Sequence, residues 1–223
     1  MYQGKAIWKR LFKNSDWIKG RVMASTIKEK VDEIILPYRA KTKIINQKFT
    51  NKKTDFMVGG EFAPDVFRKP ITIEICISAE KGYVYFSKKK KERFIFLLSQ
   101  TLQHELIHLN QFKNRGCENF YTHYYTFSKG QSRSSLQKLE YFAMVEEIDA
   151  FSHDLAMEIC YYYPNIDYKT VLKNINDFEQ LHTWKVYRRT FKKARWIHVR
   201  NELLRKTYRW LPVVKMQYGW LTK

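Results

Sequence analysis

Two histidines near the middle of the chain have the residue type and the spacing of a metal site. The stretch His104-Glu-Leu-Ile-His108 separates them by four positions. In a helix, both imidazoles would leave the same face, one turn apart. Two side chains held in this way can share a zinc ion at about 2.0–2.1 Å. The spacing therefore predicts that His104 and His108 are ligands of one Zn²⁺.

Glu105 follows the first histidine, one step around the predicted helix. This position is too far around the helix for Glu105 to bind the same ion as the two histidines. Coordination to zinc lowers the pKa of a water molecule to near 7, and a carboxylate beside it can then act as general base. Glu105 is the predicted catalytic residue, and the predicted chemistry is metal-assisted hydrolysis.

A chance match is the alternative, because a lone histidine on an apolar helix is usually a core residue. The surrounding segment ERFIFLLSQTLQHELIHLNQF is apolar on nearly every side, which predicts a central, buried helix. Burying three titratable groups there is costly unless they are neutralised or coordinated. This cost favours the metal site.

A third protein ligand is required, because catalytic zinc sites keep three and leave one position open. Gln111 and Asn114 stand where the metzincin pattern has a glycine and a third histidine, so that solution fails. The remaining solution is a glutamate on a later helix. The segment KLEYFAMVEEIDAFSHDLA offers three candidates: Glu140, Glu146 and Glu147.

Glu147 is the preferred candidate, because Ala143 and Ala150 share its helix face. Small residues on either side would let this helix approach the histidines closely. The face of Glu146 is bulkier and more polar, so Glu146 is the fallback. A solvated helix face is the commoner explanation for any one of these acids alone.

HExxH followed by ExxA on a second helix looks like the gluzincin branch of the zincin metallopeptidases. More narrowly, QHELIHLNQF with EIDAF resembles small phage-encoded metallopeptidases, whose pattern is close to HELVHVxQ followed by EIEAY. The resemblance implies that His104, His108 and Glu147 bind zinc and that Glu105 is the general base. Asp149 departs from that pattern, which has glutamate there, and the substrate-binding edge strand of zincins has no recognisable counterpart.

Peptide hydrolysis also needs a donor for the oxyanion that forms during attack. The loop between the two ligand-bearing helices offers candidates by position: His123, Tyr124 and Tyr125. The alternative is that these side chains only pack the loop. The helix of the predicted third ligand also carries three later residues that could orient metal-bound imidazoles: Asp149, His153 and Asp154. At least two of these three are expected at the surface.

The formal charge of the 223-residue chain is +19, which indicates an anionic partner. The segment from Lys185 to Arg209 has ten lysines or arginines and a single acid, Glu202. As a helix, it would gather Trp196, Val199, Leu203 and Trp210 on one stripe. The predicted polyanion-binding residues lie outside that stripe: Arg188, Arg189, Lys192, Lys193, Arg195, Arg205 and Lys206. An anionic membrane surface and a merely solvated face are the alternatives.

Three widely spaced cysteines without a CxxC pair indicate a reducing compartment. The first residues contain no apolar core of a secretory signal, and no apolar run reaches the roughly 20 residues of a membrane span. A soluble, cytoplasmic protein is expected; a phage protein would act in the host cell or be packaged in the virion.

The order of elements predicts an α+β fold. Residues 1–36 have a helical pattern that Pro37 ends, and three or four strands are expected between Thr42 and Ser87. Within ITIEICIS, Ile71, Ile73, Ile75 and Ile77 alternate with polar residues, as in a strand with one buried face. The HExxH helix follows, and further helices are expected at 134–163, 168–182 and 184–210, the last closed by Pro212.

We therefore expect a zincin-like domain over residues 1–183, with a small antiparallel or mixed sheet packed on a central HExxH helix. A basic, aromatic helical extension over 184–223 would pack on the same core. The expected activity is zinc-dependent hydrolysis of peptide or protein substrates. The alternative is a protein associated with the virion or with nucleic acid, which keeps a zincin fold and has little or no activity.

Overall fold

The structure is a computed structural model, and it describes residues 4–49, 55–62, 70–78, 81–116 and 135–218. The chain divides into two compact units, residues 1–121 and 122–223. The first unit contains all the described strands, and the described part of the second is helical. The two units are described in turn.

A three-stranded mixed sheet forms the centre of the first unit. Its strands are β2 (Ala40–Gln47), β3 (Phe56–Glu61) and β4 (Ile71–Ser78), in the order β2-β4-β3. Strand β4 runs parallel to β2 and antiparallel to β3. The four predicted core isoleucines of β4 are 0–3% exposed, which confirms the alternation expected from the sequence. In this order, β3 is an edge strand.

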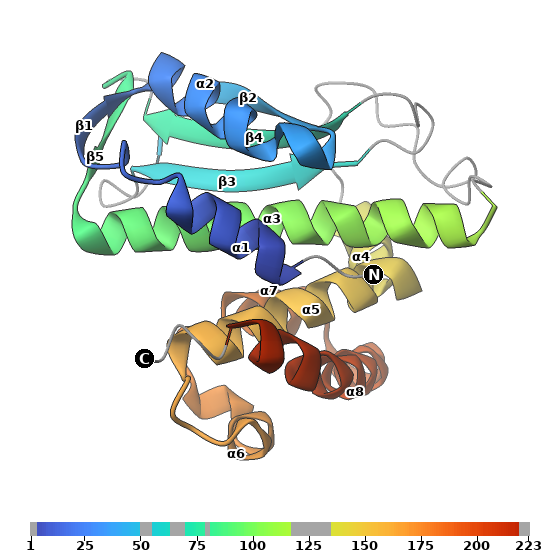
Figure 1. Ribbon diagram of the computed structural model, residues 1–223. Coiled ribbons are helices and arrows are strands. Elements are labelled where there is room, and N and C mark those ends of the chain that lie inside the picture. Colours follow the sequence, from blue (N-terminus) through green and yellow to red (C-terminus); the bar gives the residue numbers. More distant parts are fainter. Residues whose placement is uncertain (1–3, 50–54, 63–69, 79–80, 117–134, 219–223) are drawn as a thin grey trace. The chain divides into compact units, whose positions relative to one another are not determined.

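Two helices cover the two faces of this sheet, α2 (Ala24–Ile35) and α3 (Lys88–Asn114) (Figure 1). Helix α3 begins at the cap residue Ser87, whose hydroxyl accepts a hydrogen bond from the amide of Lys90. It contacts β3 and β4 and also helix α1 (Gly4–Lys13). The predicted central helix is confirmed, and it includes the lysines of 88–91.

The expectation of one helical segment over residues 1–36 was wrong in part. Between α1 and α2, strand β1 (Gly20–Met23) pairs antiparallel with β5 (Tyr83–Phe86). Helix α1 ends at Lys13, and Gly20 opens β1 at a φ of +62°, a conformation that favours glycine. Helix α2 passes into the short 3₁₀ turn Leu36–Tyr38, which contains Pro37.

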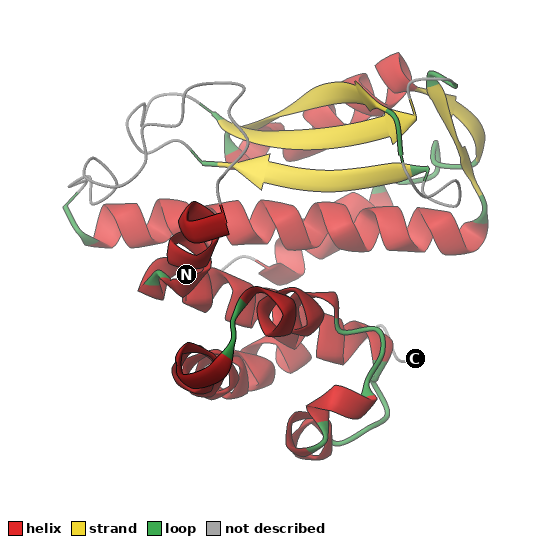
Figure 2. Cartoon of the chain, turned by 180° about the vertical axis from the view of Figure 1, so that it is seen from behind, coloured by secondary structure: helices red, strands yellow, loops and turns green. Residues whose placement is uncertain are grey.

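The described elements of the second unit are all helices (Figure 2), and helix α5 (Val145–Tyr162) lies at their centre. It contacts α4 (Ser135–Ala143), α6 (Tyr168–Lys173), α7 (His182–Thr190) and α8 (Lys193–Tyr218), and the contact with α8 is the most extensive. A 3₁₀ turn, Ile175–Asp177, lies between α6 and α7. The predicted stripe of α8 is its packed side: Val199 and Leu203 are buried.

The helices of the second unit differ from those expected at four points. The helix expected over 168–182 ends at Lys173, and only a 3₁₀ turn at 175–177 follows it before α7. The helix predicted over 134–163 is interrupted at Met144, whose backbone is extended (φ −65°, ψ 139°). The segment 184–210 is two helices, because the chain turns at Phe191. Pro212 lies inside α8 instead of ending it; its side chain is exposed, where water can solvate the carbonyl that loses its amide partner. The α+β fold class is confirmed.

Candidate metal centre

The HExxH histidines lie on α3 with their ring nitrogens turned toward each other. Nε2 of His104 and Nε2 of His108 are 3.1 Å apart, and both side chains are 7% exposed. Two ligands at 2.0–2.1 Å from a tetrahedral ion would be separated by about 3.3 Å. The arrangement therefore has nearly the spacing of two imidazoles that share one ion.

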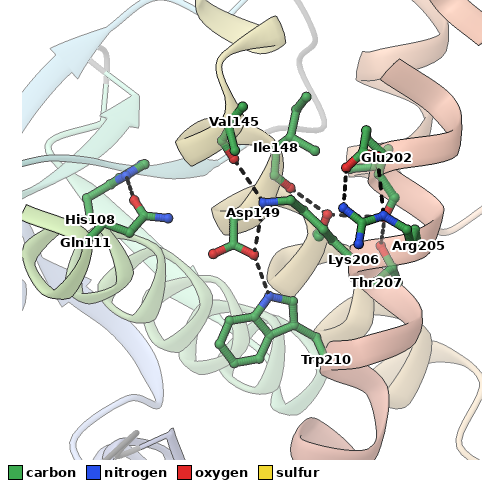
Figure 3. A network of polar contacts seen from close by, with 12 residues as sticks. His108, Gln111, Val145, Ile148, Asp149, Glu202, Arg205, Lys206, Thr207 and Trp210 are labelled. Atoms are coloured by element: carbon green, nitrogen blue, oxygen red, sulfur yellow. Dashed lines mark hydrogen bonds and ion pairs between the residues drawn. The ribbon is translucent and has the colours of Figure 1, made fainter. Parts of the chain in front are cut away.

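Gln111 sets the orientation of the second imidazole. Its Oε1 lies 3.0 Å from Nδ1 of His108 (Figure 3). Because an amide oxygen can only accept, Nδ1 carries the proton in this contact and Nε2 is left as the ligand atom. Hydrogen bonds of this kind orient imidazoles in known metal sites. Sequence reasoning noticed Gln111 only as a departure from the metzincin pattern and missed this contact.

Glu105 is buried on the same helix, against edge strand β3. The residue is 6% exposed. The backbone of Gly60 approaches it so closely that a methyl group there would come within 2.7 Å of Cγ and 2.8 Å of Oε1. On one side, the Glu105 side chain therefore packs against the backbone of Gly60, which has no side chain. Gly59 and Gly60 both lie inside β3.

Glu147 is 3% exposed and lies in the first turn of α5, whereas Glu146 beside it is half-buried. Among the described residues, the buried side chains of His104, His108 and Glu147 form a group that could hold a metal ion. Each offers one ligand atom, and the three atoms lie within 4.8 Å of one another. Two imidazoles and a carboxylate are a donor set that suits zinc. The residues present therefore fit a metal ion.

The three residues considered as orienting groups differ in their surroundings. Asp149 is half-buried and is engaged by α8: it accepts a hydrogen bond from Nε1 of Trp210 (3.3 Å) and lies 3.5 Å from Nζ of Lys206 (Figure 3). His153 and Asp154 are buried, so the expectation of surface positions was wrong for these two. Nδ1 of His153 lies 3.8 Å from Oδ1 of Asp154.

Tyr187 on α7 is a buried phenol that sequence reasoning missed. It is 0% exposed, and its ring contacts Phe142, Phe151 and Phe191. Burial raises the pKa of its hydroxyl well above 10, and the nearby negative charges of Glu147 and Asp154 raise it further. The hydroxyl is therefore a neutral donor near the carboxylate of Glu147. Its sequence neighbours are mostly basic and gave no signal of this position.

The predicted oxyanion donors His123, Tyr124 and Tyr125 lie outside the described residues. Of the predicted polyanion-binding residues, Arg188, Arg189, Lys192, Arg195 and Arg205 are exposed and Lys206 is half-buried; the side chain of Lys193 is outside the description. Within the described ranges, no helix has both the length and the apolar composition that crossing a membrane would require.

Comparisons with protein-family models, with curated proteins and with solved structures found no match to this chain. The described residues thus offer a buried His-His-Glu group that could hold a metal ion, consistent with an HExxH-type site.

Proposed function

We propose that this protein is a zinc-dependent peptidase of the zincin type. The observation that supports the proposal most strongly is the pair of Nε2 atoms of His104 and His108, 3.1 Å apart on one buried helix that also carries Glu105. Glu147 is the proposed third ligand, because its carboxylate belongs to the same group of potential ligand atoms. With three protein ligands, a tetrahedral ion keeps one position for water or substrate.

A bound zinc ion would supply Lewis acidity and would lower the pKa of a water molecule to near 7. The protein's part is to present its ligands in the correct form. Gln111 holds the proton of His108 on Nδ1, so Nε2 faces the ion. Burial of the two imidazoles keeps bulk water away from the ligand atoms and strengthens every charge interaction there.

Glu105 is the proposed general base. As a carboxylate, it can accept a proton from the attacking water and later return that proton to the leaving amine. Its position depends on the contact with Gly60, because the side chain has no room to move toward β3. Precise placement matters, since a displacement of about 1 Å can reduce turnover by roughly 100-fold.

The edge strand β3 suggests how a substrate would lie. Strand β4 is its only described pairing partner, and the residues of its last half are exposed: Gly59, Gly60 and Glu61. An extended peptide could add to this edge through main-chain hydrogen bonds. Such a peptide would pass Gly60 and so bring a peptide bond close to Glu105. We therefore propose extended polypeptide as the substrate class; a phage origin and action in a host cell or virion rest on the motif resemblance alone.

The test compares wild type with Glu105→Gln in a proteome-derived peptide library, read by mass spectrometry of new termini. Wild type is expected to generate cleavages, and Glu105→Gln to lose at least about 100-fold of that rate while keeping its metal, because a general base contributes about 10²–10⁴-fold. Glu140→Gln, at an exposed acid, is the matched control. Metal-loaded wild type that cleaves nothing, or Glu105→Gln with full activity, would contradict a peptidase and favour a protein without turnover.

A further inference from the structure

The turn between α7 and α8 carries a dense group of exposed cations. Four described side chains within eight residues form it, and we name them the corner cluster: Arg188, Arg189, Lys192 and Arg195. Helix α8 continues the positive surface with exposed Arg200, Arg205 and Arg209. Between Lys185 and Arg209, Glu202 is the single acidic residue. The second unit therefore presents strong positive charge at one identifiable place.

The corner cluster keeps its charge available. Glu202 pairs with Arg205 at 2.6 Å, and Lys206 lies 3.5 Å from Asp149 while it also donates to the carbonyl of Val145 (Figure 3). In contrast, no ion pair engages the corner cluster within the described part of the chain. Arg188 donates to the neutral amide oxygen of Asn176, which leaves its charge uncompensated. The structure thus separates Arg205 and Lys206 from the four residues of the corner cluster.

Helix stability accounts for only part of the corner cluster. Arg188 and Arg189 lie in the last turn of α7, where cations stabilise the helix. Arg195 lies instead in the first turn of α8. Like charges close together on a helix surface repel each other. The first turn of α8 contains no acidic residue, although acids stabilise that end of a helix and cations do not. An anionic partner would relieve this repulsion. Folding therefore leaves the cations at the start of α8 unexplained, and an anionic partner accounts for them.

The backbone that carries the cluster is firmly anchored. Phe191, in the middle of the turn, is 2% exposed and packs against Tyr187. On the two sides of the turn, the rings of Trp184 and Trp196 lie 5.1 Å apart. The charges are thus presented from a preorganised surface, which reduces the entropy lost on binding.

A membrane surface fits this region poorly. Peripheral helices bind membranes by inserting an apolar face below the headgroups. Most apolar side chains of α8 are already used, because Val199, Leu203, Leu211 and Val214 are 0–2% exposed and α8 packs on α5. The exposed Ile197, Tyr208 and Met216 are spread along the helix. Insertion would require this packing to open. A partner whose charges lie on its surface needs no such change.

We propose that the corner cluster binds the phosphate backbone of a nucleic acid. Three of its four members are arginines, whose planar guanidinium groups match phosphate oxygens in bidentate fashion. Binding of this kind neutralises phosphates and is largely independent of base sequence. The proposal does not depend on the metal centre, since the cluster and its supports belong to α7 and α8.

Fluorescence anisotropy with labelled 30-nucleotide duplex and single-stranded DNA tests the proposal. Wild type is expected to bind with a Kd of about 1–100 µM near physiological salt, and more tightly at lower salt. Replacing all four cluster residues by glutamine should weaken binding at least about 10-fold. It should also reduce the slope of log K against log salt by about 3–4 on duplex, because each lost phosphate contact removes about 0.9.

A control variant that loses four charges elsewhere distinguishes binding by the corner cluster from general attraction by the net positive charge. Lys9, Lys41, Lys48 and Lys89 are exposed in the first unit, and their joint replacement by glutamine should leave most of the binding intact. Equal losses in the two variants would overturn the proposal, as would absence of DNA binding by wild type. Tighter binding of wild type to vesicles of anionic phospholipid than to DNA would overturn it in favour of a membrane. Circular dichroism confirms that each variant is folded.

Discussion

The backbone of Gly60 touches the side chain of Glu105. A methyl group at Gly60 would lie 2.7 Å from Cγ and 2.8 Å from Oε1 of that glutamate, and 2.8 Å from Cγ2 of Thr101. These separations are shorter than ordinary van der Waals contact. The proposed general base is therefore positioned by the edge strand as well as by its own helix.

This contact makes Gly60→Ala a sharp test of how Glu105 works. The added methyl should push the carboxylate away, and the rate of peptide cleavage should fall by roughly 10–100-fold with the metal retained. Gly59→Ala is the matched control, because a methyl there meets nothing within 4 Å. Cleavage rate and metal content are measured for both. Full activity in Gly60→Ala would show that the position of Glu105 does not matter.

Gln111→Ala should weaken metal binding without abolishing it. The substitution removes the acceptor that keeps the proton of His108 on Nδ1. Loss of such an orienting contact typically costs 10–100-fold in metal affinity. Competition with a chromophoric chelator measures the change, and Asn110→Ala, at the exposed neighbouring position, should have no effect. Unchanged affinity in Gln111→Ala would remove Gln111 from the site.

Glu158 stabilises the second unit through the start of α7. Its buried carboxylate accepts hydrogen bonds from the amide of Thr183 (3.1 Å) and from the Thr183 hydroxyl (2.9 Å). Glu158→Ala should lower the free energy of unfolding by about 2–3 kcal/mol, because it leaves buried donors unsatisfied. Glu179→Ala, at an exposed acid, should change it by less than about 0.5 kcal/mol. Urea denaturation measures both, and equal midpoints would refute the role of Glu158.

Burial raises the pKa of the Cys160 thiol from 9.0 to about 11, although Lys215 acts in the opposite direction. At pH 8, the reactive thiolate is then roughly 100-fold scarcer than for a thiol with the ordinary value. Cys160 should therefore alkylate slowly in the native protein and quickly in urea, as followed by peptide mass spectrometry. Rapid native labelling at pH 8 would contradict the raised pKa.

The same shift has a consequence for alkaline stability. Because the folded-state pKa lies above the unfolded one, the contribution of Cys160 is fully present below pH 9 and is lost as the pH rises toward 11. The raised pKa of Tyr187 acts in the same direction at higher pH. The midpoint of thermal unfolding should therefore fall between pH 9 and 11, and Cys160→Ala should lessen the fall. A midpoint that is flat over this range would be inconsistent with these shifts.

Local patterns predicted the parts of the fold that depend on local residues. The alternation of Ile71 to Ile77 predicted a half-buried strand, and the apolar segment around His104 predicted the central helix. The break at Met144 could not be foreseen, since Ala143-Met144-Val145 contains neither proline nor glycine. Pro212 wrongly predicted the end of the last helix, because an exposed proline can be accommodated within a helix.

The histidine pair of the site followed from spacing alone, because i and i+4 positions of a helix are always neighbours. Glu147 was preferred over Glu146 for its small neighbours, and the structure buries Glu147 more deeply. The contributions of Gly60 and Tyr187 depend on how distant segments meet, which no local period encodes. Ligation of zinc, catalysis by Glu105, and the division at residues 183 and 184 stay predictions.

The metal content of protein purified without added metal tests the central claim most directly. Elemental analysis should find about one zinc per chain in wild type and in Glu146→Ala, and a large loss in Glu147→Ala and His108→Ala. Glu146 is the matched control, since it is the neighbouring acid on the same helix and does not belong to the His-His-Glu group. Wild type without stoichiometric metal, or loss of metal from Glu146→Ala with Glu147→Ala unaffected, would contradict the claim.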